Sequence, residues 1–251
     1  MVHIVGAGPG DPELITVKGQ RCLSEADVVI YAGSLVNPQL LDYCKEGAAI
    51  YNSASMTLDD VVAVIAEAEQ KGQMTVRLHT GDPSVYGAIQ EQMDAFSKKG
   101  IKFDVIPGVS SCFATAAALK QEYTLPGISQ TVIITRNEGR TPVPEREKLR
   151  SLAQHQSTMC IYLSITMLDK VVAELIAGGY RPETPIAIVQ RASWPEQKIV
   201  RGTLATIVKD IEDEHIDRTA MIVVSNCLEA DYELSRLYAP EFSHMFRKAS
   251  K

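Results

Sequence analysis

The sequence predicts a two-domain α/β protein with a parallel sheet in the first domain and a mixed sheet in the second. In the first half, short runs of β-branched and apolar residues alternate with helical patterns. This alternation is typical of a parallel sheet covered by helices. It breaks at residues 122–127, where a proline and a glycine follow polar residues, and strands and helices then resume. We therefore predict domains at 1–121 and 122–240, followed by a tail at 241–251.

The first domain is expected to hold five strands and five helices. Apolar runs predict strands at 2–5, 28–31, 49–51, 75–78 and 103–106, and periodic patterns predict helices at 13–26, 38–44, 57–70, 88–98 and 112–119. Leu14, Val17, Cys22 and Leu23 are expected to form the apolar side of the first helix. Thr57 and Asp60 have the spacing of a capping box, with Asp in place of Glu.

The second domain repeats the alternation less regularly. Strands are expected at 130–135, 158–163, 185–190, 198–201 and 220–224, and helices at 147–153, 168–177 and 204–213. The turn at 192–195 is too short for a helix, so the strand at 198–201 is expected to pair antiparallel with a neighbour. This pairing predicts a mixed sheet.

Composition narrows the class of protein. The chain has 251 residues, 45% of them apolar and 22% charged, which is enough for one large or two modest cores. Its net charge of −6 argues against a general nucleic-acid binder. We see neither an apolar run of about 20 residues nor a signal peptide, and we expect a cytoplasmic protein without a membrane partner. The five cysteines and five histidines show no metal-ligand spacing, so no protein-bound metal is expected.

The N-terminal stretch MVHIVGAGPGD is the first candidate for a binding loop. A buried strand that ends in glycines lets a ligand approach the backbone without meeting a Cβ atom. The dinucleotide fingerprint would require a third glycine at position 11, where this chain has Asp11, and Pro9 lacks an N–H donor. A turn that binds nothing therefore remains an equal alternative for this motif alone.

Two further strand ends carry similar loops. The strand at 75–78 leads into HTGDPSVYG and the strand at 103–106 leads into PGVSS. In an open parallel sheet, ligands bind outside the carboxyl ends of the strands, so the three loops predict a shared crevice. Asp82, Ser110 and Ser111 are its candidate polar residues, with helix capping as the alternative role for each.

Five motifs taken together resemble the tetrapyrrole methylase family: GAGPGD, ADVVIYAGSLV, LHTGDPSVYG, VIPGVSS and TRNEGRTPVP. They are most similar to the branch that acts on precorrin-4 in cobalamin biosynthesis. The resemblance implies the two-domain fold of that family, with the cofactor clamped between the domains, and commonly a homodimer. It also implies transfer of a methyl group from S-adenosylmethionine (AdoMet) to C11 of cobalt-precorrin-4, giving cobalt-precorrin-5A and S-adenosylhomocysteine (AdoHcy). Metal-free precorrin-4 is the alternative substrate.

The resemblance further implies cofactor-binding positions in both domains. These are Pro9, Thr80, Gly81, Asp82, Val85, Ser110 and Ser111 in the first domain, and Leu163, Ala192, Thr219, Ala220 and Met221 in the second. Composition alone would place Leu163 and Met221 in the core.

A substrate site is predicted from charge. The tetrapyrrole substrate carries many carboxylates, and Arg136 and Arg140 lie in one strand-end loop, where arginine forks suit carboxylates. A solvated surface loop is the alternative. Tyr31, Ser34 and Glu138 are further candidates for orienting the substrate. Related uroporphyrinogen-III methyltransferases carry Asp after the second strand, but Ala32 follows Tyr31 here, so no catalytic acid or base is assigned.

Two other classes of protein stay open. An NAD(P)-dependent oxidoreductase could use the GAGPGD loop, although Asp11 disfavours it. A non-catalytic tetrapyrrole-binding protein would bind the macrocycle without affinity for AdoHcy.

Overall fold

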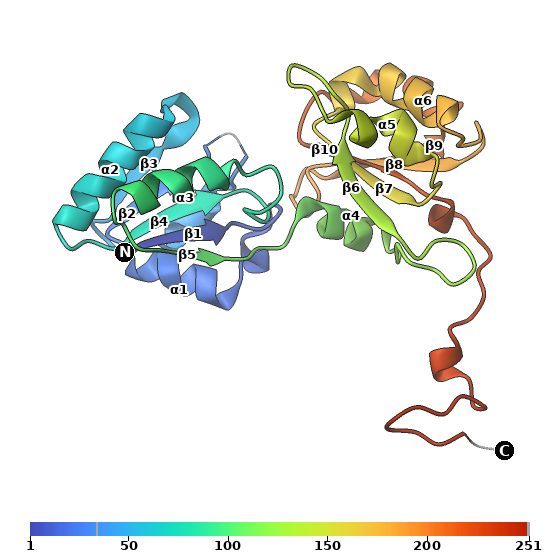
Figure 1. The fold of residues 1–251 in the computed structure, drawn as a ribbon, viewed down its shortest axis with the longest axis horizontal. Helices are drawn as coiled ribbons and strands as arrows, with labels where there is room; N and C mark the ends of the chain where they lie inside the picture. Colours follow the sequence, from blue (N-terminus) through green and yellow to red (C-terminus); the bar gives the residue numbers. More distant parts are fainter. Residues whose placement is uncertain (34, 250–251) are drawn as a thin grey trace. The chain divides into compact units, whose positions relative to one another are not determined.

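The computed structural model describes residues 1–33 and 35–249. Its contacts divide the chain into two compact units (Figure 1). The first comprises Met1–Ala118 and Arg191–Lys198, and the second comprises Leu119–Gln190 and Ile199–Lys251. The return of residues 191–198 to the first unit was not predicted from the sequence.

The first unit is built on a parallel sheet, as predicted. Its strands are β1 (Val2–Gly6), β2 (Val28–Tyr31), β3 (Ala49–Asn52), β4 (Thr75–His79) and β5 (Phe103–Ile106). They are ordered β3-β2-β4-β1-β5, and every neighbouring pair is parallel. Gly6 lies opposite His79 and Val5 lies opposite Ile106, so the ends of β1, β4 and β5 are level. The loops that follow these three strands therefore start from one edge of the sheet.

Both faces of this sheet are covered by helices (Figure 1). The helical segments before β5 are η1 (Pro12–Leu14), α1 (Val17–Glu25), η2 (Pro38–Tyr43), η3 (Ser53–Ser55), α2 (Leu58–Gln70) and α3 (Ile89–Lys98), and α4 (Ser111–Leu119) follows β5. One core cluster joins the sheet to α1 through Leu23, and another joins it to α2 and α3 through Ile65 and Phe96. Burial on both faces explains why the strands are almost continuously apolar.

The helix predicted at 13–26 was wrong in its first turn. The Thr16 hydroxyl accepts a hydrogen bond from Gly19 N at 3.0 Å and starts α1 at Val17. The chain before it forms the separate 3₁₀ turn η1. Leu14 is consequently 36% exposed and Val17 81% exposed, whereas Cys22 and Leu23 are buried as predicted. The capping box at α2 is confirmed, with both Thr57–Asp60 hydrogen bonds present.

The second unit contains the mixed sheet. Its strands are β6 (Val132–Arg136), β7 (Thr158–Tyr162), β8 (Pro185–Gln190), β9 (Lys198–Thr203) and β10 (Ala220–Val224), in the order β6-β7-β10-β8-β9. β6 and β7 are parallel, and β10 runs antiparallel to both β7 and β8. The predicted mixed sheet is therefore confirmed.

Helices α5 (Leu149–Ala153) and α6 (Leu168–Ala177) pack against this sheet through a single apolar core. The helices predicted at 147–153 and 204–213 are shorter than expected. Extended backbone at Lys148 separates η4 (Glu145–Glu147) from α5. The second predicted helix divides into α7 (Ile207–Asp210) and η6 (Glu212–Glu214). The other 3₁₀ turns are η5 (Ile165–Met167), η7 (Asn226–Leu228) and η8 (Arg236–Tyr238).

The described residues contain no helix that is long and apolar enough to cross a membrane. Nor does that part of the chain contain a cluster of metal-ligating side chains. All five cysteines are free thiols, and only Cys44 is not fully buried.

Candidate functional site

Three loops gather at the carboxyl edge of the parallel sheet. Loop 1 (residues 7–11) follows β1, loop 2 (residues 80–88) follows β4, and loop 3 (residues 107–110) follows β5. Because β1 lies between β4 and β5, loop 1 has loop 2 on one side and loop 3 on the other. Strand order thus brings together three motifs that lie far apart in the sequence.

Glycines allow the three loops to touch backbone to backbone. A Cβ atom on Gly6 would lie 2.6 Å from the Gly108 backbone and 2.7 Å from the Gly81 carbonyl oxygen. A Cβ atom on Gly108 would lie 2.1 Å from that same oxygen. Real Cβ atoms do not approach backbone so closely, so any side chain at Gly6 or Gly108 would force the loops apart.

Hydrogen bonds join loop 1 to loop 2 past the end of the sheet. Ala7 N donates to the His79 carbonyl at 2.7 Å, and Gly8 and Gly81 donate to each other at 3.2 and 2.8 Å. The backbone N–H groups of Gly8 and Gly81 are therefore satisfied within the protein. These two donors hold the loops together and are not free to bind a ligand.

Asp82 links loop 2 to loop 3. Its Oδ2 accepts from Gly108 N at 2.9 Å, and its Oδ1 accepts from Ser84 N at 2.9 Å and from the Ser84 hydroxyl. Partial burial opposes ionisation, but these hydrogen bonds prevail and lower the pKa of the carboxyl. The alternative role of helix N-cap is excluded, because α3 begins at Ile89 and is preceded by Ala88. Asp82 therefore fixes the loop while keeping part of its surface exposed.

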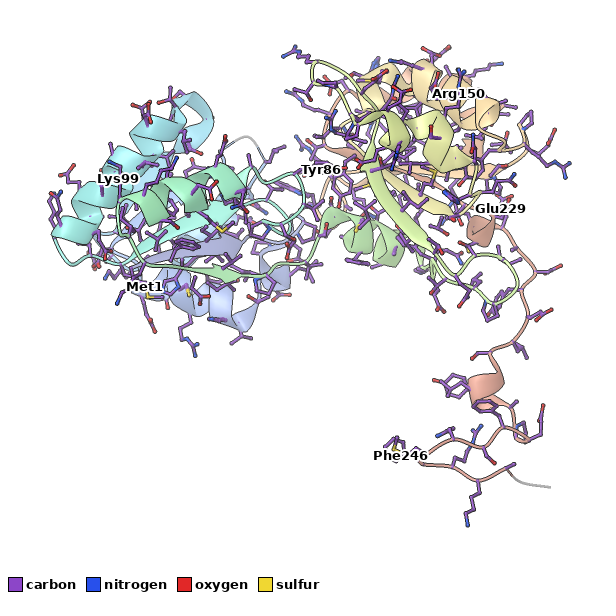
Figure 2. The ribbon with its side chains drawn as sticks, viewed as in Figure 1. Met1, Tyr86, Lys99, Arg150, Glu229 and Phe246 are labelled. Carbon is purple, nitrogen blue, oxygen red and sulfur yellow. The ribbon has the colours of Figure 1, made fainter. Side chains whose placement is uncertain are left out.

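Loop 2 holds an unusual backbone conformation. Tyr86 and Ala88 both have left-handed φ angles, +56° and +50°, which are strained for residues other than glycine. Between them, a Cβ atom on Gly87 would lie 2.2 Å from the Pro83 carbonyl oxygen. The Tyr86 side chain is 46% exposed at this turn (Figure 2). Strain of this kind tends to persist at binding sites, where surrounding structure enforces it.

Buried polar atoms without a partner lie in loop 2, at the end of β4 and in α4. They include the hydroxyls of Thr80, in loop 2, and Thr115, in α4, and Nε2 of His79. A buried hydroxyl without a hydrogen bond is costly unless another group satisfies it. Thr80 directly precedes Gly81, so its orphaned hydroxyl suits a loop that closes around a polar ligand. Ser110 lies in loop 3, directly before α4, and its carbonyl accepts the first bonds of that helix, from Phe113 N at 3.1 Å and Ala114 N at 3.2 Å.

Three buried polar side chains, those of Arg77, His79 and Gln92, lie in and next to β4. Arg77 donates to Gln92 Oε1 at 3.1 Å and to the Ile30 carbonyl at 3.1 Å, and burial lowers its pKa to about 10. Burial and the nearby positive charge of Arg77 lower the pKa of His79 to about 3, despite a hydrogen bond with Gln92. At neutral pH, His79 is therefore an uncharged imidazole and too weak a base to accept a proton.

A segment that the sequence analysis missed lies against loop 1. This strap (residues 191–198) connects β8 to β9 in the sequence but packs in the first unit. Trp194 Nε1 donates to the Pro9 carbonyl at 2.9 Å, and Asp11 N donates to the Ser193 hydroxyl at 3.0 Å. Ala192, which we had assigned to the second domain, is buried in this strap and therefore belongs to the first unit. Only the lone tryptophan in a short turn could have signalled the strap.

Strand register gathers the second unit's predicted residues at one end of its sheet. Arg136 lies opposite Tyr162 across the β6–β7 pair, and Ile222 lies opposite Ile161 across the β7–β10 pair. Leu163 and residues 219–221 therefore lie side by side, next to the start of the arginine loop. Ala220 also lies opposite Gln190, the last residue before the strap.

The exposed residues at this end are strained. Leu163 has a φ of +53° and is 65% exposed, although it follows a buried strand. Thr219 also has a φ of +53° and is exposed. Met221 is buried in the core, as composition suggested. An exposed leucine in a strained turn is typical of a contact surface, whereas a core role is excluded for Leu163.

The two arginines of the 136–140 loop behave differently. The Arg136 guanidinium donates to the carbonyls of Asn137, Thr141 and Pro142 at 3.3, 3.1 and 2.8 Å. It therefore holds its own loop in shape. Arg140 is exposed and forms no ion pair with any described residue. Arg140 is thus the better placed of the two to meet an external carboxylate.

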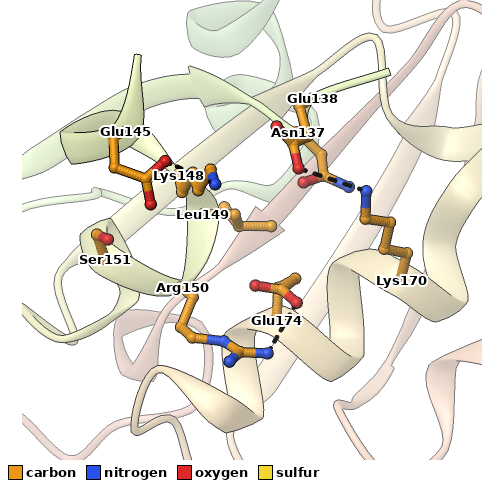
Figure 3. Close-up of a pocket in the computed structure, with 9 residues that line it drawn as sticks. All are labelled: Asn137, Glu138, Glu145, Lys148, Leu149, Arg150, Ser151, Lys170 and Glu174. Carbon is orange, nitrogen blue, oxygen red and sulfur yellow. Dashed lines mark hydrogen bonds and ion pairs between the residues drawn. The ribbon is translucent and has the colours of Figure 1, made fainter. Parts of the chain in front are cut away.

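Glu138 lines a polar pocket of about 310 Å³ in the second unit (Figure 3). Three ion pairs neutralise its walls: Lys170–Glu138 at 3.8 Å, Arg150–Glu174 at 3.0 Å and Lys148–Glu145 at 2.7 Å. Balanced charge gives this pocket no preference for a polyanionic ligand. If Glu138 contacts the substrate as predicted, that contact has to compete with the ion pair between Glu138 and Lys170.

The remaining substrate candidates lie after β2. Tyr31 is half-buried at the end of that strand, and its carbonyl accepts from the Ser53 hydroxyl at 3.1 Å. Ser34 lies outside the described residues. The structure therefore places Tyr31 at the same sheet edge as the glycine loops.

Packed glycine loops, a buried hydroxyl without a partner and strained strand ends are typical of the class of α/β proteins that bind a small ligand at strand ends. The family model of Tetrapyrrole (Corrin/Porphyrin) Methylases matches residues 1–208. The chain belongs to this family, which confirms the resemblance inferred from its motifs.

Similar proteins narrow the comparison. The chain is 60% identical over 251 residues to the cobalt-precorrin-4 C(11)-methyltransferase of Methanocaldococcus jannaschii, covering 100% of this chain and 97% of that one. An X-ray structure of a cobalt precorrin-4 methyltransferase aligns with a TM-score of 0.89 at 46% identity, over 91% and 96% of the two chains. Uroporphyrin-III C-methyl transferase from Thermus thermophilus, complexed with S-adenyl homocysteine, aligns with a TM-score of 0.76 at 26% identity, over 91% and 93%.

The glycine contacts generate a test of the loop packing. Gly6→Ala should lower the free energy of unfolding by about 1–3 kcal/mol, because its methyl group meets backbone in both neighbouring loops. Denaturant unfolding measures this change. Gly139→Ala is the control, since its methyl group meets only the flexible end of Met167 at 3.0 Å. Equal stability of the two variants would contradict the packing described above.

Proposed function

We propose that this protein is an AdoMet-dependent methyltransferase that methylates C11 of cobalt-precorrin-4 to give cobalt-precorrin-5A. The observation that carries the proposal is the 60% identity, over the whole chain, to a protein of that named activity. A neighbour of the same fold is complexed with S-adenyl homocysteine, the form of the cofactor after methyl transfer. Cofactor use and reaction class follow from these two likenesses together.

The proposed cofactor site begins with the glycine loops. AdoMet carries a carboxylate, an amine, ribose hydroxyls and an adenine, and it needs polar groups together with close access to backbone. Thr80 supplies a buried hydroxyl without a partner, and the absence of a Cβ atom on Gly108 lets the Gly81 carbonyl lie against loop 3. These residues fit the group. The other proposed cofactor-binding residues of the first unit are Pro9, Asp82, Val85, Ser110, Ser111 and, in the strap, Ala192.

The second unit supplies the other proposed cofactor contacts. Leu163, Thr219, Ala220 and Met221 lie together at one sheet end. The exposed Leu163 side chain offers apolar surface to a ligand. Met221 is buried, so its contribution would come from its backbone or from shaping its neighbours.

Chemistry at the site requires positioning more than proton transfer. When bound, AdoMet would supply a methyl group from its cationic sulfur to an electron-rich carbon of the macrocycle, with the C–S bond broken to leave neutral AdoHcy and a proton released from the macrocycle. Tyr31 is followed by Ala32, so no carboxylate stands after β2 to act as a base. His79 is uncharged and buried. The chain's residues therefore act by holding the two reactants in line and by excluding water.

The structure gives an argument against the NAD(P)-dependent alternative. The dinucleotide fingerprint places its last glycine at the start of a helix, whose N-terminus faces the pyrophosphate. Here loop 1 leads into the 3₁₀ turn η1, and α1 begins only at Val17. The helix N-terminus is consequently not next to the glycines.

Product analysis tests the proposal. Incubation with AdoMet and cobalt-precorrin-4 should yield a product heavier by one methyl group, with AdoHcy released in equal amount, as measured by mass spectrometry. Metal-free precorrin-4, offered in parallel, identifies the preferred form of the substrate. A protein that binds the macrocycle but neither binds AdoHcy nor transfers a methyl group would be a tetrapyrrole-binding protein instead.

Charge supports a substrate contact at Arg140. The substrate carries several carboxylates, and the chain has a net charge of −6, so binding requires locally concentrated positive charge. Arg140 is exposed and makes no ion pair in the described chain, whereas the Arg136 guanidinium is occupied by backbone carbonyls. We therefore propose that Arg140 binds the substrate directly and that Arg136 shapes the loop.

Paired variants separate these roles. Arg140→Gln should raise the KM for the tetrapyrrole about tenfold to a hundredfold, since a charge-assisted contact is worth about 1.5–3 kcal/mol. Its melting temperature and its affinity for AdoHcy should stay unchanged. Arg136→Gln should lower the melting temperature, because three carbonyls lose their donor. A normal KM in Arg140→Gln would remove that residue from the substrate site.

We also propose a homodimer. The C-terminal segment exposes large apolar side chains, with Leu234, Tyr238 and Phe246 between 81% and 89% exposed. Such surface is costly in water and is usually covered by a partner, most often in a C2 dimer. Light scattering at micromolar concentration should give twice the mass of one chain. Deletion of residues 232–249 should shift the mass to that of a monomer if this segment forms the interface.

A further inference from the structure

We propose that Trp194 is a positioning residue for the AdoMet loop: docking of the strap on loop 1 sets the affinity for the cofactor. This inference rests on the proposed function, and it assigns a role to a residue that does not belong to the predicted site. The observations that carry it are the contacts between the strap and residues 9–11.

The strap grips loop 1 on both sides of Gly10. Trp194 Nε1 donates to the carbonyl before it, on Pro9, at 2.9 Å. The Ser193 hydroxyl accepts from the N–H after it, on Asp11, at 3.0 Å. The indole itself lies on Gly10, because a Cβ atom there would come within 2.0 Å of the ring atoms Cδ1 and Nε1. Position 10 therefore has to be glycine for Trp194 to dock.

Loop 1 is also held from its other side. Asn37 is buried, and its Nδ2 donates to the Gly10 carbonyl at 2.8 Å. Asn37 and the strap thereby engage the Pro9 carbonyl, the Gly10 carbonyl and the Asp11 N–H. Of these two contacts with loop 1, Asn37 and the strap, only the strap contains a residue proposed to bind the cofactor, Ala192. A displacement of the strap would move loop 1 and Ala192 at the same time.

The strap is shaped for this contact. Arg191 and Ser193 have left-handed φ angles of +48° and +71°, which are unfavourable for residues other than glycine. Internal bonds hold the turn: Ser193 N donates to Gln197 Oε1 at 2.9 Å, and the Arg191 guanidinium lies 5.6 Å from the Trp194 ring centre. The cost of this strained turn has to be offset by the contacts that it makes, and those with loop 1 are among them.

Substitutions that remove one part of the contact at a time test the role. Trp194→Phe keeps an aromatic ring over Gly10 but removes the donor to Pro9, and it should raise the Kd of AdoHcy about threefold to tenfold. Trp194→Ala removes both and should raise the Kd by a larger factor. The KM for the tetrapyrrole should stay unchanged in Trp194→Phe, and its kcat should return to the unaltered value at saturating AdoMet.

Tyr180→Phe is the matched control. The Tyr180 hydroxyl, like Trp194 Nε1, donates from an aromatic side chain to a backbone carbonyl, here that of Ser157, but Tyr180 is buried in the second unit's core. Its loss should lower the melting temperature and leave the Kd of AdoHcy within about twofold of the unaltered value. A merely structural role for Trp194 would give the same result as this control.

The decisive measurements are calorimetric titration with AdoHcy and melting temperature, on the full chain of each variant. A raised Kd in both Trp194 variants, with Tyr180→Phe unaffected, supports the positioning role. An unchanged Kd in the Trp194 variants, beside normal binding by the unaltered protein, would overturn that role alone. Absence of AdoHcy binding by the unaltered protein would overturn the proposed function, and the positioning role with it.

Discussion

The close approach of three backbones at Gly6, Gly81 and Gly108 is the constraint on which the site depends. The carboxyl ends of parallel strands lie at one edge of the sheet. Neighbouring strands are about 4.8 Å apart, and side chains normally fill the space beyond their ends. Because Gly6 and Gly108 lack Cβ atoms, the Gly81 carbonyl lies against both the end of β1 and loop 3. The loops can then bond to one another, through the paired Gly8 and Gly81 and through Asp82 and Gly108 N. A rigid edge of bare backbone results.

Much of this arrangement could be predicted from the sequence, because it follows from local rules. Apolar runs ending in glycine marked β1, β4 and β5, and parallel pairing then dictated that their loops would share an edge. The capping-box spacing of Thr57 and Asp60 predicted the start of α2. The first helix was misjudged because Thr16, a local cap, outweighed the apolar residues that precede it. Side-chain spacing alone does not show where capping interrupts a pattern.

The parts that could not be predicted depend on contacts between residues far apart in the chain. Trp194 lies 185 residues from its acceptor, Pro9, and nothing in its neighbourhood indicates that its strap leaves the strands that flank it. Arg136 and Arg140 look equivalent in sequence, yet the fold of the loop gives one guanidinium three carbonyl partners and leaves the other exposed. These differences arise from the path of the backbone, which cannot be inferred from the type of a single residue.

Among the described residues, left-handed backbone outside glycine falls into two groups. Of the left-handed residues other than glycine, Lys120, Gln156 and His215 follow helical segments, where that conformation commonly ends a helix. The remaining six lie in loop 2, in the strap and at the sheet end around Leu163 and Thr219. No helix ending explains these positions, so their cost has to be offset by packing that serves another purpose. Because the loops satisfy many of their own hydrogen bonds, the proposed binding of AdoMet would depend on how accurately these strained segments are held.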